Sequence, residues 1–63
     1  MALSREKLNE LHDLGRLVES LTSSAYTAYL MGKAQAAGEI VGTVEDLVEG
    51  TKAVVEELRA PPP

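Results

Sequence analysis

One stretch of the sequence decides the fold: AGEIVGTVEDLVEGTKAVVEEL, residues 37–58. Its positions at alternating steps of three and four are apolar with one exception, Thr51: Ala37, Ile40, Val44, Leu47, Thr51, Val54 and Leu58. Valines at 41, 48 and 55 widen this stripe on one side, because each follows a stripe residue directly. The pattern is typical of an amphipathic helix whose apolar face covers positions a, d and e of a heptad. So wide a face suits a helical bundle better than a two-stranded coiled coil.

The first half of the chain also has helical periodicity. Ser4 is a suitable N-cap, and Leu3 and Leu8 stand where a hydrophobic staple places its two side chains. Beyond the cap, apolar residues recur at steps of three and four: Leu8, Leu11, Leu14, Val18, Leu21, Ala25 and Ala28, with Leu17 beside them. These features predict an amphipathic helix over about residues 4–31.

The two apolar stripes are out of heptad phase with each other, which predicts a break between them. Gly32 and Gly38 can each adopt the left-handed conformation that ends many helices. We therefore expect an all-α helical hairpin in a single domain, residues 1–60. Its first helix spans about 4–31, its turn lies near 32–38, and its second helix spans about 38–60. A proline tail, 61–63, follows, because Pro61 disfavours helical backbone in the residue before it.

Two other arrangements fit parts of the sequence. Apolar residues also recur every eleven positions, a repeat that would keep one stripe straight along a single long helix: Leu3, Leu14, Ala25, Ala36, Leu47 and Leu58. A further break at Gly42–Thr43 is the second alternative, because the residues 43–46, TVED, resemble a capping box.

The length of the chain limits the stability that it can gain alone. A single core rarely stabilises a chain below about 70–80 residues without a disulfide, a metal or oligomerisation. The 63-residue chain has no cysteine and one histidine, which leaves oligomerisation. We expect a homo-oligomer, most simply a dimer that closes a four-helix bundle, or a related helical oligomer.

Charge excludes several classes of partner. Residues 1–33 carry equal numbers of acidic and basic side chains, whereas residues 34–63 carry six acidic and two basic ones, a net charge of −4 there. Nucleic-acid binding needs a clustered basic face, which this sequence lacks. The longest uncharged run, residues 20–32, is too short and too polar for a transmembrane helix. With no signal peptide pattern at the N-terminus and no cysteine, we expect a soluble, cytoplasmic protein.

Candidate chemical groups are few. His12 lies beside Asp13 on the polar side of its helix, which indicates a solvated side chain rather than a pH switch. The acidic residues 45, 46 and 49 lie on a helix surface, where they do not converge as calcium or magnesium ligands do. The hydroxyls of residues 20–24 have no base placed beside them. We therefore expect no catalytic residue, no metal and no cofactor, and no enzymatic activity.

The sequence thus predicts a small helical oligomerisation or protein-interaction module, a scaffold or regulator that acts through its helical faces. The residues expected to carry helix packing and self-association are Leu11, Leu14, Val18, Leu21, Ala25, Ile40, Val44, Leu47, Val48, Val54 and Leu58. Tyr26 and Tyr29 are the only aromatic residues, and they either anchor a partner or, as we prefer, fill the interface of the hairpin itself. The alternative function is an amphipathic helix on a lipid surface, against which the acidic second half and the lack of Trp and Phe argue.

Overall fold

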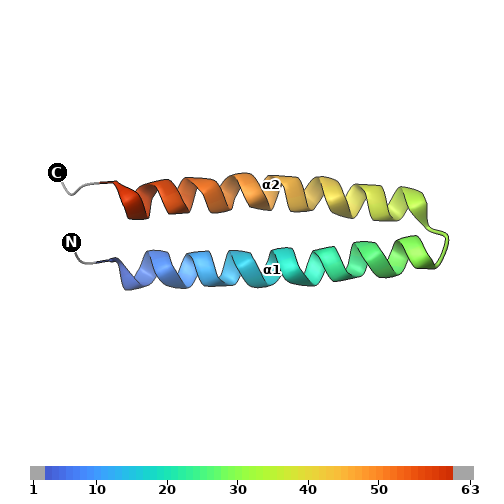
Figure 1. Cartoon of the computed structure of the whole chain (residues 1–63), viewed down its shortest axis with the longest axis horizontal. Helices are drawn as coiled ribbons and strands as arrows, with labels where there is room; N and C mark the ends of the chain where they lie inside the picture. The colour runs from blue at the N-terminus through green and yellow to red at the C-terminus, as the bar shows by residue number, and fades with distance from the viewer. Residues whose placement is uncertain (1–2, 61–63) are drawn as a thin grey trace.

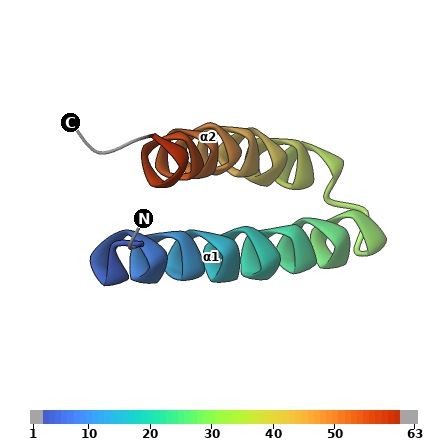
Figure 2. The same cartoon turned by 60° about the vertical axis from the view of Figure 1, so that its left-hand side comes forward.

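The computed structural model describes residues 3–60 and consists of two helices, α1 (Arg5–Leu30) and α2 (Ala34–Arg59), joined by a turn at 31–33. The helices lie side by side and antiparallel, so the start of α1 and the end of α2 are at the same end of the molecule (Figure 1). The view turned by 60° shows the same two-helix pair (Figure 2). Its principal-axis extents are 50 × 15 × 10 Å. The predicted all-α hairpin is confirmed. A single long helix is excluded, and Gly42–Thr43 lies inside α2. The predicted proline tail lies outside the described residues.

α1 begins at the predicted cap. Ser4 has extended backbone, and its hydroxyl accepts a hydrogen bond from the backbone N–H of Lys7 at 3.2 Å. This contact satisfies one of the free N–H groups that every helix start exposes. Glu6 in the first turn adds a negative charge at the positive end of the helix dipole. Local sequence therefore fixes this end of the hairpin.

Gly32 makes the turn. Its φ of +78° lies in the left-handed region, where no other described residue is found. Gly32 donates its N–H to the carbonyl of Tyr29 at 3.0 Å, and Lys33 donates its N–H to the carbonyl of Ala28 at 2.9 Å. These two bonds are the pair that defines a Schellman C-cap. α2 starts directly afterwards at Ala34, so Gly38, the other glycine considered for the turn, is helical.

A single seam of side chains joins the helices, and all of its residues are buried or half-buried. On α1 the seam consists of Lys7, Leu11, Leu14, Val18, Leu21, Ala25 and Ala28, and on α2 of Ala37, Ile40, Val44, Leu47, Thr51, Val54 and Leu58. The seam residues pair symmetrically about the turn. Ala28 pairs with Ala37 next to the turn, Lys7 pairs with Leu58 at the far end, and in every pair the two residues lie equally far from the turn. The antiparallel pairing therefore aligns both heptad patterns along their whole length.

The seam differs from the sequence pattern at two places. Leu8 is 41% exposed, and its neighbour Lys7 occupies the seam position instead. Thr51 is the one hydroxyl in the seam, and it donates to the carbonyl of Leu47 at 2.8 Å. That bond satisfies the hydroxyl within its own helix, so the polar residue can lie among apolar neighbours.

The fully buried core is small. Among the described residues, only Ala25, Ala37 and Val54 are buried, and no large side chain is fully enclosed. Apolar burial is the main favourable term in folding and scales with the area removed from water. The isolated hairpin therefore gains little from its core.

The turn provides a test of the hairpin by glycine substitution. Gly32→Ala should lower the melting temperature, because alanine is strained at positive φ, with a cost of about 1 kcal/mol. Gly38→Ala should raise it, because Gly38 is helical, nothing lies within 4 Å of an added Cβ, and alanine gains up to about 1 kcal/mol in a helix. Thermal melts followed by circular dichroism at one protein concentration measure both. A higher melting temperature for both variants would contradict the turn.

Candidate interaction surface

Ten of the residues that we predicted for helix packing and self-association lie in the seam. They are Leu11, Leu14, Val18, Leu21, Ala25, Ile40, Val44, Leu47, Val54 and Leu58. These side chains hold α1 against α2. The eleventh, Val48, is 40% exposed and lies outside the seam. It is therefore the member of the set that faces away from the intramolecular contact.

Lys7 is a contact residue that sequence reasoning missed. Its ammonium group lies 2.7 Å from the carboxylate of Glu57 on α2 and 3.3 Å from that of Glu10 on its own helix. The side chain is half-buried, so its methylene stem covers the end of the seam while the charge stays in water. Its position in the sequence identifies it, because Lys7 lies as many residues before the turn as the seam residue Leu58 lies after it.

The ion pair sets the charge state of Lys7 over a wide pH range. The hydrogen bond to Glu57, and after it the one to Glu10, raise the pKa of Lys7 above its ordinary 10.5. A raised lysine pKa contributes stability below the ordinary pKa, and that contribution is lost as the pH rises through the higher folded-state value. The raised pKa extends the charged state of Lys7 further into the alkaline range, although a solvent-exposed pair such as this one contributes little to stability.

The main exposed apolar feature is what we call the valine edge: Val41, Val48 and Val55 on α2, with Leu8 on α1. Val41 is 49% exposed and Val48 is 40% exposed, while Val55 is half-buried. All four residues directly follow a seam residue, at heptad position e, and in an antiparallel pair the e positions of both helices lie along the same edge. An open groove on α2 continues this surface, lined by Val41, Val44, Glu45, Asp46, Val48 and Glu49.

Of the other exposed apolar side chains, Tyr29 follows the seam residue Ala28 at position e and lies on the same edge near the turn, whereas Leu17 lies apart from it. Leu17, 51% exposed, takes heptad position g and therefore lies on the opposite edge. Tyr26 and Tyr29 are 65% and 66% exposed. The interpretation that these tyrosines fill the interface of the hairpin is therefore wrong, because the seam passes through Ala25 and Ala28 instead. Their role as partner anchors stays a prediction.

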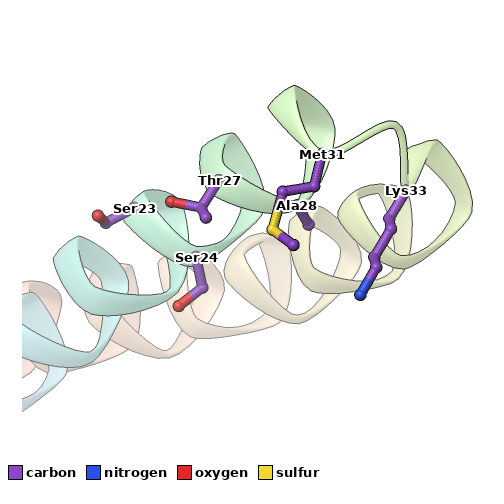
Figure 3. Close-up of a pocket in the computed structure, with 6 residues that line it drawn as sticks. All are labelled: Ser23, Ser24, Thr27, Ala28, Met31 and Lys33. Atoms are coloured by element: carbon purple, nitrogen blue, oxygen red, sulfur yellow. The ribbon is translucent and has the colours of Figure 1, made fainter.

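A second groove lies beside the turn, lined by Ser23, Ser24, Thr27, Ala28, Met31 and Lys33 (Figure 3). The Met31 side chain extends along Ala28, and Lys33 comes from the start of α2. The hydroxyl of Ser24 donates to the carbonyl of Ser20 at 3.1 Å, so its proton is engaged with the backbone. No carboxylate or imidazole is among these six residues, so the groove offers no base to activate a hydroxyl.

The charged candidates remain on the surface. His12 lies 3.4 Å from the carboxylate of Asp13, and both side chains are mostly exposed. Throughout residues 3–60, no three His, Cys, Asp or Glu side chains lie close enough together to hold a metal ion. Over the same residues, neither helix combines the length and the hydropathy that crossing a bilayer requires.

Comparisons with protein-family models, with curated proteins and with solved structures found no match to this chain.

The seam and the polar side of α2 should respond differently to truncation. Leu47→Ala should destabilise the protein by about 2 kcal/mol or more, because it removes a large apolar side chain from the middle of the seam. Glu56→Ala should change stability by less than about 0.5 kcal/mol, because Glu56 is exposed on the same helix. Urea unfolding followed by circular dichroism gives both values. Equal effects would contradict the assignment of the seam.

Proposed function

We propose that this protein is a helical oligomerisation and interaction module, whose hairpins pair through the valine edge into a homodimeric four-helix bundle. The valine edge is the observation that carries the proposal. Three valines at seven-residue intervals continue the apolar surface of the seam onto an exposed edge. Hydrophobic surface of this kind, bordered by charged residues, marks sites of protein association.

The weakness of the core supports the same proposal. With only small side chains buried in the described residues, the hairpin gains little from its own fold. Packing a second pair of helices on the valine edge would bury Val41, Val48 and Leu8 and would also cover the half-buried seam residues beside them. Binding that is specific for the folded state stabilises that state by mass action. Folding and association would then support each other, as in other small helical bundles.

A scaffold or regulator would use the surfaces that the dimer leaves free. Tyr26 and Tyr29 suit the binding of a further protein, because an exposed tyrosine offers a large apolar area, a hydroxyl and few rotatable bonds. In this proposal the module acts by binding, without a reaction of its own.

A lipid surface is a less suitable partner for the valine edge. Amphipathic helices that lie on membranes carry Lys and Arg along the polar face, and anionic lipids attract them. The groove beside the valines instead presents Glu45, Asp46 and Glu49. These carboxylates would be repelled by an anionic bilayer, which favours protein over lipid.

Solution mass measures the proposed assembly directly. At micromolar concentration, multi-angle light scattering should give twice the mass of the 6.7 kDa chain. Val48→Ser should shift the protein toward monomer, because it places a hydroxyl at the centre of the valine edge. Leu17→Ser is the matched control, since Leu17 is also exposed but lies on the opposite edge, and it should leave the mass unchanged.

A monomer that melts cooperatively, or equal effects of the two serine variants, would contradict the proposal. Circular dichroism with and without anionic vesicles separates the lipid alternative. The interaction module should be equally helical in both conditions, whereas a lipid-surface helix would gain helicity only with vesicles.

A further inference from the structure

We propose that the second copy docks antiparallel along α2, with Val48 on the two-fold axis and Glu45 of each copy paired with Lys52 of the other. This inference rests on the proposed function, which supplies the dimer, and adds the surface, the direction and the register of the contact.

The spacing of the valines carries the first step. Val41 lies seven residues before Val48, and Val55 lies seven residues after it. Seven residues are close to two helical turns, so the three side chains form a straight row along one side of α2. A two-fold axis through Val48 brings the two Val48 side chains together and places Val41 of each copy against Val55 of the other. The interface is then self-complementary, as a two-fold contact must be.

Charge decides the direction of the contact. Glu45 stands three residues before Val48, and Lys52 stands four residues after it, so both flank the valine row on the same side. An antiparallel second copy therefore faces each Glu45 with a Lys52, and it does so twice. A parallel two-fold copy would place the two Glu45/Lys52 flanks on opposite sides of the contact, so neither residue would meet an opposite charge. Opposite charges across an interface favour the antiparallel arrangement, because only that arrangement pairs Glu45 with Lys52.

The surroundings of these two residues permit the contact. Lys52 is the only basic residue of α2 before Arg59. Its present partner, Glu49, is 3.6 Å away in a pair whose side chains are 67% and 75% exposed. An exposed pair of this kind holds a lysine weakly, so the ammonium group can turn to a carboxylate on a second copy.

α1 leaves the valine row accessible. At its own e positions α1 carries Leu8, Gly15, Thr22 and, next to the turn, Tyr29, and Gly15 lies opposite Val48 in the heptad alignment. Gly15 is exposed and has nothing within 4 Å of an added Cβ. With a glycine beside Val48, no α1 side chain rises above the valines there, and a second α2 can approach closely.

Charge reversal tests the register. Glu45→Lys and Lys52→Glu, made singly, should each weaken the dimer about tenfold or more in Kd, because two attractive pairs become repulsive. An equimolar mixture of the two single variants should form a heterodimer, and the double variant E45K/K52E should dimerise like the original protein. Glu56→Lys is the matched control, since it makes the same charge change away from the valine edge. Sedimentation equilibrium measures the masses, and circular dichroism checks that each variant remains helical.

The outcomes separate the two proposals. A monomeric original protein would overturn both the proposed function and this register. A dimeric original protein with unaffected single variants would overturn the register alone and leave the proposed function standing. Single variants that dissociate but do not recover on mixing would also overturn the register, since complementary charges would then fail to restore the contact.

Discussion

Two helices in contact share one line of side chains, and the rest of each helix surface faces water. In this hairpin each 26-residue helix contributes seven residues to that line. Because the contact is one residue deep, its large side chains remain half-buried, and only two alanines and a valine are buried among the described residues. Three features follow from this geometry. The turn and the contacts at the ends of the hairpin hold the seam residues of the two helices in register. The valine edge is apolar surface that the narrow seam leaves uncovered.

The α2 seam could be predicted from the sequence because its heptad spacing is uninterrupted, and a regular spacing needs no information about the partner. The turn and the start of the α1 seam needed a further constraint. In an antiparallel hairpin, seam residues must lie at equal distances on either side of the turn. Ala28 and Ala37 have their midpoint between Gly32 and Lys33, which favours Gly32 over Gly38. The same symmetry places Lys7, and not Leu8, opposite Leu58. A hydrophobic pattern alone favours Leu8, since lysine is usually a surface residue.

The division of the apolar face into a buried seam and an exposed edge could not be predicted from α2 alone. Position e is covered in a hairpin only if the facing edge of the other helix carries side chains long enough to reach it. On α1 those positions include Gly15 and Thr22, which are too short to cover Val48 and Val41. The open groove at Val41 and Val48 is the result. The width of the apolar stripe on α2 therefore indicates that more than one helix packs against it. The side chains of α1 determine which part of that stripe remains uncovered.

Different interactions hold the helices together at the two ends of the hairpin, and this difference affects how the molecule can associate. At the turn end, hydrogen bonds close the Schellman cap, and small residues (Ala25, Ala28 and Ala37) let the helices approach closely. At the other end, where α1 begins and α2 ends, the exposed Lys7–Glu57 ion pair and the methylene stem of Lys7 over the seam hold the helices together. In the middle, Val18 and Leu47 are half-buried, so further cover would remove more of their apolar surface from water. Val48 adjoins Leu47 in this middle section, so a partner docked there would also shield Leu47. The valine edge thus lies next to half-buried seam residues, and a second copy docked on it would add to the burial that the hairpin achieves alone.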